Sequence, residues 1–409
     1  MSGKIEAPRG TLDALPGQSA ARERVLATTA EVAALYGYQT VVTPTFEATE
    51  LFQRTAGLGS DVVSKEMYTF SDRSDRSLTL RPEGTAGVAR AFVEHGLHKS
   101  PLPVKAWYAG PMFRYAAVQR GRYREFWQVG FEAIGSPDHG LDVELIRLFV
   151  EITQRLGLGA IRLELNSIGD RNCRPAYVEQ LRAFLAEHRS ELDDDARAKA
   201  DTSPLRVFDT KSPNSAAVLA AAPTIGESLC ADCAAHFAET RALLDALGVA
   251  YTVNPTLVRG LDYYTRTVWE FVNDDLDASQ STVCAGGRYD GLLEEIGGQP
   301  TPGVGWAAGV ERLALSLGDV QAEAGIDVFV VVEEPARRQE ALVGLAVLRA
   351  RGIAADTDYA GRSLKGQLTQ AQRLGARTTL LVRADGIAVR RRGESDIVVE
   401  TIGEAVEKL

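Results

Sequence analysis

The 409-residue sequence contains few cysteines, and they are unevenly spaced: Cys173, Cys230, Cys233 and Cys284. Small secreted domains that depend on disulfides are dense in cysteine, so no disulfide framework is expected. The sequence also lacks an apolar run long enough to cross a bilayer, and the polar segment 2–10 is unlike a signal peptide. These absences favour a cytosolic globular protein with no membrane partner.

Basic residues do not outnumber acidic ones in this sequence. The chain has 45 Lys and Arg against 55 Asp and Glu, a formal net charge of -10. This balance does not indicate nucleic-acid binding, but a local basic stripe can bind phosphate even on an acidic protein. Segment 327–409 has 13 basic and 12 acidic residues, so the acidic excess lies before it.

The length predicts two to three domains. Residues 104–135 have the pattern of strand, loop and strand, and residues 141–156 that of an amphipathic helix ended by Gly157. From residue 326, apolar strands alternate with helices, which is typical of a separate small α/β domain. The expected domains are a first domain in two parts (1–169 and 239–320), a helical insertion (170–238) and a C-terminal domain (326–409), with 317–325 containing the linker.

Four segments contain the residues best suited to chemistry. Segment 81–85 places an acid, Glu83, and a hydroxyl, Thr85, where an ammonium group could bind. Arg114 is followed by a Gln-Arg-Gly-Arg loop at 119–122, and then come Gln128 and Glu132, which lie four apart and therefore share one face of a strand. The other two are the Arg-Gly-Leu-Asp-Tyr-Tyr segment that begins at 259 and the glycine-rich residues at 285–290 and 303–313.

Three arginines stand out in these segments. Arg114, Arg259 and Arg312 could each form a structural ion pair. Together, among glycines and acids, they favour a polyphosphate site, because guanidinium groups bind phosphate oxygens in pairs. Glycines allow backbone to approach a ligand closely. No Ser-His-Asp or similar nucleophilic triad is evident.

The spacing of Cys230, Cys233 and His236 is similar to a metal-binding pattern. A tetrahedral zinc site needs more ligands, and the sequence offers no evident fourth, so we favour ordinary helix packing in the insertion. Cys284 is interpreted as a small residue of a pocket wall rather than as a reactive thiol.

In order along the chain, these segments resemble the motifs of class II aminoacyl-tRNA synthetases. Residues 38–52 resemble motif one, Arg114 with its loop motif two, and 309–313 motif three. Residues 9–16, 259–270 and 286–290 resemble segments peculiar to histidyl-tRNA synthetases, and 361–376 resembles their anticodon-binding domain. The resemblance implies an α+β fold: a class II antiparallel sheet flanked by helices, a helical insertion and a C-terminal α/β anticodon-binding domain.

The resemblance also implies residue roles in activating histidine with ATP and Mg²⁺ and charging tRNA(His). Arg114 and Arg259 would bind the α-phosphate, Arg312 the far end of ATP, and Arg122 would also contact ATP. In the histidine site, the α-amino group would be held by Glu83, Thr85 and Gln128. The two imidazole nitrogens would be held by Glu132 and Tyr264, and Tyr289 would line the same pocket.

For tRNA, the resemblance assigns Gln119 and Arg120 to the acceptor end and Arg362 and Lys365 to the anticodon. Residues 390–392, three arginines, are either a second RNA contact or a solvated turn. Motif one implies a homodimer interface.

One position departs from the family pattern. An acid that contributes to ATP recognition usually stands two residues after the motif-two arginine, where this chain has Ala116. This leaves a second hypothesis open: a catalytically inactive, histidine-binding paralogue that regulates ATP phosphoribosyltransferase. Such paralogues typically lack the C-terminal domain and the 259–270 segment, and this chain has both. A third hypothesis is another class II synthetase with a similar anticodon domain.

Overall fold

The computed structural model describes residues 4–57, 60, 62–159, 161–210, 212–277, 281–318, 325–391 and 393–409. The chain divides into two compact units, 1–320 and 321–409. The predicted linker, 317–325, lies largely outside the described residues. Among the described helices, none combines the length and the apolar character needed to span a membrane.

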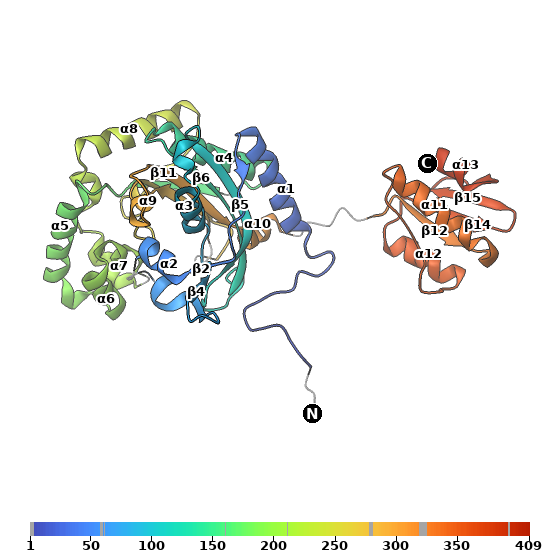
Figure 1. Ribbon diagram of the computed structural model, residues 1–409, viewed down its shortest axis with the longest axis horizontal. Coiled ribbons are helices and arrows are strands. Elements are labelled where there is room, and N and C mark those ends of the chain that lie inside the picture. Colours follow the sequence, from blue (N-terminus) through green and yellow to red (C-terminus); the bar gives the residue numbers. More distant parts are fainter. Residues whose placement is uncertain are drawn as a thin grey trace. The chain divides into compact units, whose positions relative to one another are not determined.

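An eight-stranded sheet organises the first unit, in the order β1-β5-β6-β11-β10-β9-β7-β8 (Figure 1). Its central strands pair antiparallel, while β1 and β8 at the two edges pair parallel with their neighbours. The strands are β1 (Gln39–Thr40), β5 (Val104–Phe113), β6 (Glu125–Ile134), β7 (Ile161–Ser167), β8 (Thr252–Val253), β9 (Thr265–Asn273), β10 (Thr282–Arg288) and β11 (Gly303–Gly309). A small sheet joins β2 (Phe46–Ala48), β4 (Ser77–Leu80) and β3 (Tyr68–Ser71).

The two faces of the large sheet differ in character. Val129, Phe131 and Ala133 of β6 point into the main apolar core, while the alternating Gln128 and Glu132 point to the opposite face. The core face is covered by α1 (Ala20–Leu35), α4 (Gly140–Leu156), α8 (Ala231–Ala246) and α10 (Val310–Leu317). The other face carries α2 (Thr49–Ala56), α3 (Thr85–Glu94) and α9 (Leu292–Glu295).

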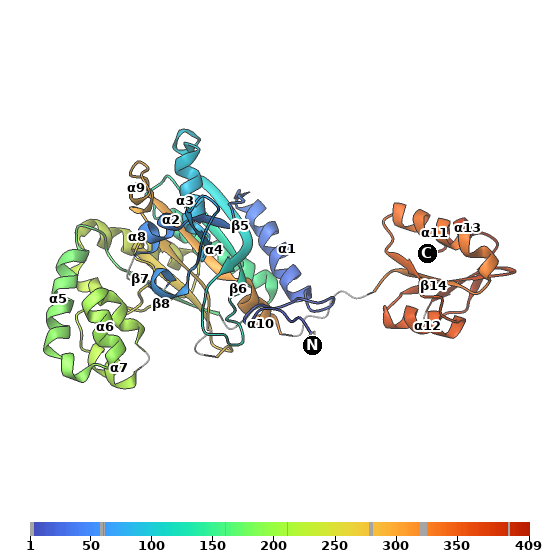
Figure 2. The same cartoon turned by 60° about the horizontal axis from the view of Figure 1, so that its bottom comes forward.

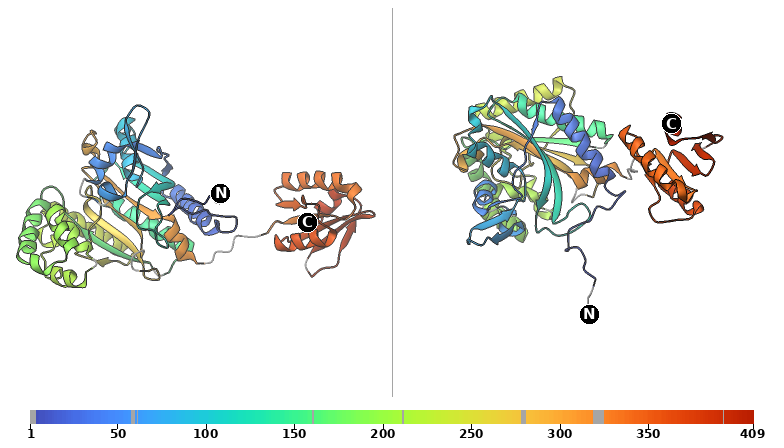
Figure 3. Two further views of the ribbon diagram at one scale, coloured as in Figure 1. Left: turned by 90° about the horizontal axis from the view of Figure 1, so that it is seen from below. Right: turned by 45° about the vertical axis from the view of Figure 1, so that its right-hand side comes forward.

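The helical insertion packs around its own apolar core. Its helices α5 (Arg174–Glu187), α6 (Asp194–Thr202) and α7 (Pro213–Leu219) lie together beside the β7–β8 edge of the sheet (Figures 2 and 3). That core contains Tyr177, Leu181, Leu185, Leu192, Val207, Leu219 and Ile225. Helix α8 then leads the chain back onto the sheet. The predicted helical character of 170–235 is confirmed, and the strand expected from residue 258 begins only at Thr265.

The second unit is an α/β layer structure with a five-stranded sheet in the order β13-β12-β14-β15-β16. Helices α11 and α13 pack on one face, and α12 packs on the other (Figure 2). The predicted strands at 328–332 and 378–382 and both predicted helices are present. The elements are β12 (Val328–Val332), α11 (Arg338–Ala350), β13 (Ala355–Thr357), α12 (Leu364–Arg373), β14 (Thr378–Arg383), β15 (Gly386–Arg391), β16 (Ile397–Val399) and α13 (Ile402–Glu407).

A fully buried ion pair joins the sheet to the helices of the first unit. Arg288, at the end of β10, lies 2.8 Å from Asp142 of α4, and both side chains have no exposed surface. His236 of α8 lies 3.3 Å from the second Asp142 oxygen. Burial alone would raise the pKa of Asp142, but Arg288 and His236 hold that pKa below its usual value. Asp142 therefore connects α4, α8 and β10 through one carboxylate.

Replacing Asp142 by Asn is expected to lower the unfolding free energy of the first unit by about 3 to 5 kcal/mol, because Arg288 would stay buried without its fully buried counter-charge and keep only the partly exposed Asp290 at 3.3 Å. Denaturant unfolding followed by tryptophan fluorescence measures this unit alone, since all four tryptophans lie in it. Glu50→Gln, which breaks an exposed pair with Arg54, is the matched control and should cost less than about 1 kcal/mol. Equal losses in the two variants would contradict a structural role for the buried pair.

Candidate active site

A cavity of about 210 Å³ lies on the face of the large sheet opposite the main core. It is bounded by strands β6, β10 and β11, by the loop between β5 and β6, and by the segment that precedes β9. The predicted residues in its lining are Glu83, Thr85, Arg114, Ala116, Arg122, Gln128, Arg259, Tyr264, Cys284 and Arg312. The structure therefore brings together side chains separated by more than two hundred positions.

The arginines at one side of the cavity are held by backbone carbonyl groups. Arg114 Nε donates to Pro82 O at 2.8 Å, and Arg312 Nη1 donates to Thr282 O at 2.6 Å. Arg122 is paired with Glu66 at 2.9 Å. Burial lowers the pKa of Arg312, and the nearby positive charges of Arg114 and Arg122 lower it further. Three guanidinium groups close enough to repel one another form a strongly positive wall that suits a polyanion.

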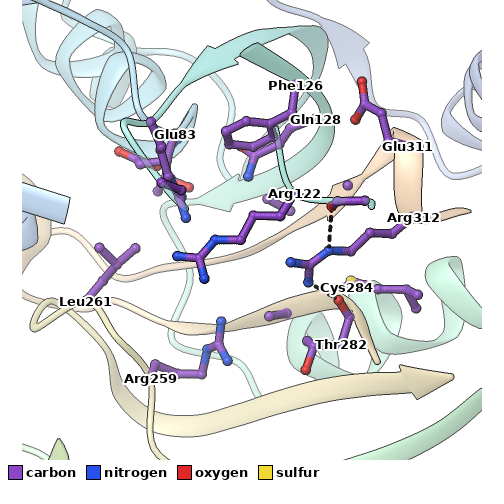
Figure 4. A pocket seen from close by; sticks show the side chains of 18 of the residues that line it. Glu83, Arg122, Phe126, Gln128, Arg259, Leu261, Thr282, Cys284, Glu311 and Arg312 are labelled. Atoms are coloured by element: carbon purple, nitrogen blue, oxygen red, sulfur yellow. Dashed lines mark hydrogen bonds between the residues drawn. The ribbon is translucent and has the colours of Figure 1, made fainter. Parts of the chain in front are cut away.

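Arg259 approaches the same cavity from the opposite side. Figure 4 shows its side chain pointing toward the space that Arg122 and Arg312 also enter. One of its terminal nitrogens pairs with Glu270 of β9, and Thr282 donates a hydroxyl hydrogen bond to Glu270 at 2.8 Å. Its Nε is buried and has no hydrogen-bond partner in the described part of the chain. Arg259 is thus positioned by an ion pair while retaining donor capacity.

Two of the predicted histidine-site residues, Glu132 and Tyr289, are not in the cavity lining and lie behind Thr85, which is part of that lining. Glu132 has no exposed surface, and its two oxygens accept hydrogen bonds from Thr85 Oγ1 at 2.7 Å and from the Tyr289 hydroxyl at 2.5 Å. Gly305 of β11 makes room for it, because a Cβ there would overlap the carboxylate. Burial raises the pKa of Glu132 to about 8, although both hydrogen bonds act to lower it.

Two further polar residues, Glu83 and Gln128, are in the cavity lining. Glu83 is buried at the start of α3, where its oxygens accept the Thr85 and Ala86 backbone N–H groups at 2.6 and 3.0 Å. Gln128 Oε1 is buried without a hydrogen-bond partner among the described residues. An unpartnered buried acceptor is costly in a folded protein, and an ammonium donor from a ligand would satisfy it.

Two tyrosines close the cavity on the β9 side. Burial raises the pKa of Tyr264 to about 12, while the charge of Arg259 acts in the opposite direction. The rings of Tyr263 and Tyr264 lie 4.6 Å apart, and Gly287 leaves space that a Cβ would take from Tyr264. Tyr263, like Glu66, was not selected from the sequence. The doubled tyrosine gave a signal for it, whereas Glu66 lies in a segment with no recognisable motif.

The predicted tRNA contacts occupy exposed positions. Gln119 and Arg120 lie in the exposed loop between β5 and β6. In the second unit, Arg362 pairs with Asp358 at 2.5 Å just before α12, and Lys365 is exposed in the first turn of that helix. Arg390 pairs with Asp396 at 2.7 Å, and Arg391 lies 3.4 Å from Glu394. Arg392 lies outside the described residues.

The cysteines of the insertion come together with other residues than their spacing in the sequence indicates. His236 does not join Cys230 and Cys233, because its ring contacts Asp142. The two cysteines instead gather with Asp170 and Cys173. Sequence analysis missed these two partners because they lie about sixty positions earlier in the chain.

A long antiparallel sheet that carries an arginine-lined cavity on one face, with one of the arginines on the helix after its last strand, is the fold of the class II aminoacyl-tRNA synthetases. Residues 10–313 match the family described as histidyl-tRNA synthetase. A histidine–tRNA ligase from Rhodococcus erythropolis is 48% identical over 420 residues, covering 98% of each chain. One from Rubrobacter xylanophilus is 48% identical over 378 residues, covering 90% of this chain and 89% of the relative.

Structural comparison agrees with the sequence comparison. The crystal structure of apo histidyl-tRNA synthetase from S. aureus has a TM-score of 0.83 with this chain at 37% identity, and it covers 99% of both chains. The chain belongs to the histidyl-tRNA synthetase family, which confirms the predicted family and fold class.

The raised pKa of Glu132 predicts a pH-dependent cost to stability. Between its ordinary pKa of 4.5 and the folded value of about 8, the folded chain retains a proton that the unfolded chain has released, so stability falls as pH rises. Glu132→Gln removes this dependence. Relative to wild type, the variant should gain about 2 to 4 kcal/mol between pH 5.5 and pH 8.5 in urea unfolding. A stability difference that is the same at both pH values would contradict the shift.

Proposed function

We propose that this chain activates histidine with ATP, forming histidyl-adenylate and pyrophosphate, and then transfers histidine to the 3′ end of tRNA(His). The observation that carries the proposal is the convergence of distant guanidinium groups in one cavity, beside the buried hydrogen-bonded cluster of Thr85, Glu132 and Tyr289. The histidine–tRNA ligases that align over nearly the whole chain support it.

We assign the arginines to ATP. The histidine carboxylate attacks the α-phosphorus, and the bond to the pyrophosphate leaving group breaks. Because both reactants are anionic, the reaction needs positive charge fixed in place before they meet. Arg114 and Arg259, on opposite sides of the cavity, would hold the α-phosphate, and Arg312 with Arg122 would hold the rest of the triphosphate. No protein nucleophile is required.

We assign the buried polar residues beside the arginines to histidine. Glu83, Thr85 and Gln128 would hold the α-amino group, and the unpartnered Gln128 oxygen supports this role. Glu132 and Tyr264 would contact the two imidazole nitrogens, with Tyr289 fixing Glu132. A side chain without matching polar atoms would leave these buried groups unpaired, which is how such pockets discriminate strongly between substrates.

Mg²⁺ would enter with the nucleotide. This ion keeps several waters and is usually held by substrate phosphates with one or two carboxylates. Glu66 and Glu311 are hard oxygen donors in the cavity lining. Glu66 is paired with Arg122, and both Glu311 oxygens accept the Trp127 backbone N–H, at 2.9 and 3.0 Å, while keeping lone pairs for an ion. The donor set therefore fits the ion, and bound Mg²⁺ would neutralise phosphate charge. Glu66 also supplies a carboxylate to the cavity in which Ala116 replaces the acid usual in the family.

We propose that residues 1–169 and 239–320 form the catalytic domain, 170–238 its insertion and 326–409 the anticodon-binding domain. Gln119 and Arg120 would meet the acceptor end of tRNA, and Arg362 and Lys365 the anticodon. The motif-one segment, 38–52, would form a homodimer interface. The site of action would be the cytoplasm.

The inactive regulatory paralogue is less well supported. The ligases named above align along almost the whole chain, including the 259–270 segment and the C-terminal unit. The arginines also reach the same cavity. A synthetase for another amino acid is disfavoured by the same comparisons.

Histidine-dependent exchange between ATP and pyrophosphate tests the proposed activity. Arg259→Ala should reduce the exchange rate by about 100- to 1000-fold, because a fixed positive charge is lost from the reacting phosphate. Arg162→Ala, which removes an exposed arginine of the same unit, should leave exchange near normal. Near-normal exchange in Arg259→Ala would show the phosphate role is misassigned. If the wild type shows no exchange, the regulatory paralogue would be favoured. If exchange depends on glycine, threonine or proline instead of histidine, the chain would be another synthetase.

Removing residues 326–409 should reduce tRNA charging by at least about 10-fold while adenylate formation continues, because the second unit has its own apolar cores. Charging of tRNA(His) and pyrophosphate exchange are measured on the same preparation. The full-length double variant Arg362→Ala with Lys365→Ala should lower charging selectively as well. An equal collapse of exchange after the truncation would refute the proposed domain roles.

A further inference from the structure

Four potential metal ligands converge at the neck of the helical insertion, which is the pair of chain segments by which the insertion leaves the sheet and returns to it. Asp170 and Cys173 lie on the outgoing segment, and Cys230 and Cys233 lie on the returning one. One ligand atom from each lies within 4.8 Å of all the others. The cluster is separate from the catalytic cavity, whose lining contains none of these residues.

The distances in this cluster suit a tetrahedral metal. Zinc binds thiolate sulfur at about 2.3 Å and carboxylate oxygen at about 2.0 to 2.2 Å, so ligand atoms on a tetrahedron lie roughly 3.5 to 3.8 Å apart. Asp170 Oδ1 lies 3.6 Å from Cys173 Sγ and 3.9 Å from Cys230 Sγ. These two contacts are within a few tenths of an ångström of the tetrahedral spacing, and all other pairs of ligand atoms lie within 4.8 Å, so closing on an ion would move them by about 1 Å at most.

Two of the cysteines stand at helix starts without serving as caps. Cys173 is at the N-cap position of α5 and Cys230 at that of α8, and neither side chain makes a capping hydrogen bond. Cysteine is a poor cap, so helix capping does not account for either thiol. Gly169, with φ of +64°, leaves room for the Cys173 sulfur, which a Cβ would crowd at 2.7 Å.

Cations are also placed to balance the complex. Zn²⁺ with three thiolates and one carboxylate has a net formal charge of about −2. Arg266 Nη2 lies 3.7 Å from Asp170 Oδ2. Arg174 donates to the carbonyls of Ile168, Gly169 and Tyr264 at 3.1, 3.0 and 2.5 Å. The same arginine thus links the cluster to the segment that closes the catalytic cavity.

We propose that one structural Zn²⁺ is bound by Asp170, Cys173, Cys230 and Cys233. The ion would hold together the two chain segments at the neck of the insertion. The ion takes no part in the chemistry of adenylate formation. It cross-links residues sixty positions apart, and removing it would loosen the insertion where the insertion meets β7 and β9.

Metal analysis of the untagged, full-length protein tests this directly. After dialysis against metal-free buffer, elemental analysis by inductively coupled plasma mass spectrometry should find roughly one zinc per chain. Cys173→Ser and Cys230→Ser should each lower zinc affinity by at least about 10-fold. Cys284→Ser is the matched control, since Cys284 is a buried cysteine outside the cluster, and it should retain the zinc. Asp170→Cys keeps the number of ligands and should retain it too.

Two further measurements keep the proposal testable if the serine variants do not fold. Wild type reconstituted with Co²⁺ should show thiolate-to-cobalt charge-transfer absorption, and removing zinc should speed proteolysis within 174–229. Wild type that retains no zinc, zinc content unchanged in Cys230→Ser, Co²⁺ binding without charge-transfer absorption, or an internal disulfide among the three cysteines in non-reducing mass spectrometry would each overturn the proposal. None of these readouts depends on ligase activity.

Discussion

The alternation of side chains along β6 is the constraint on which the rest of the first unit depends. Its odd-numbered residues from Val129 to Ala133 fill the main core, so Gln128 and Glu132 must face the other side of the sheet. A one-residue slip of this strand would bury the polar pair in the core and expose the apolar set. The packing of the core and the position of the residues proposed to bind histidine are therefore fixed by the same register.

The cavity separates its charges in space. Arg114 and Arg122 lower the pKa of Arg312 where phosphates are proposed to bind, while Glu132, with a pKa raised by burial, lies behind Thr85 of the lining. Glu270 holds Arg259 from behind, and backbone carbonyls hold Arg114 and Arg312. Such fixed groups need little rearrangement when charge develops during the reaction, which is the physical basis of electrostatic catalysis.

Much of this arrangement could be predicted from the sequence. The helix at 141–156, the strand pair around the 114–125 loop and the helical insertion all follow from the periodicity of apolar residues. The four segments singled out for chemistry contain nine of the ten predicted residues that line the cavity, and Cys284 is the exception. Pairings between distant segments could not be predicted. Nothing near Cys230 points to Asp170, and nothing near Arg259 shows that Glu270, eleven positions later, holds it. The strand expected from residue 258 started late because the tyrosine segment is used to close the cavity.

The insertion has its own apolar core, and its two ends come together, with the Gly169 backbone close to Leu229. A segment that starts and finishes at one point adds almost no strain to the sheet from which it emerges. The entropy of closing such a loop grows only slowly with its length. Residues can therefore be gained or lost between α5 and α7 over evolutionary time while the strand register beneath them is preserved.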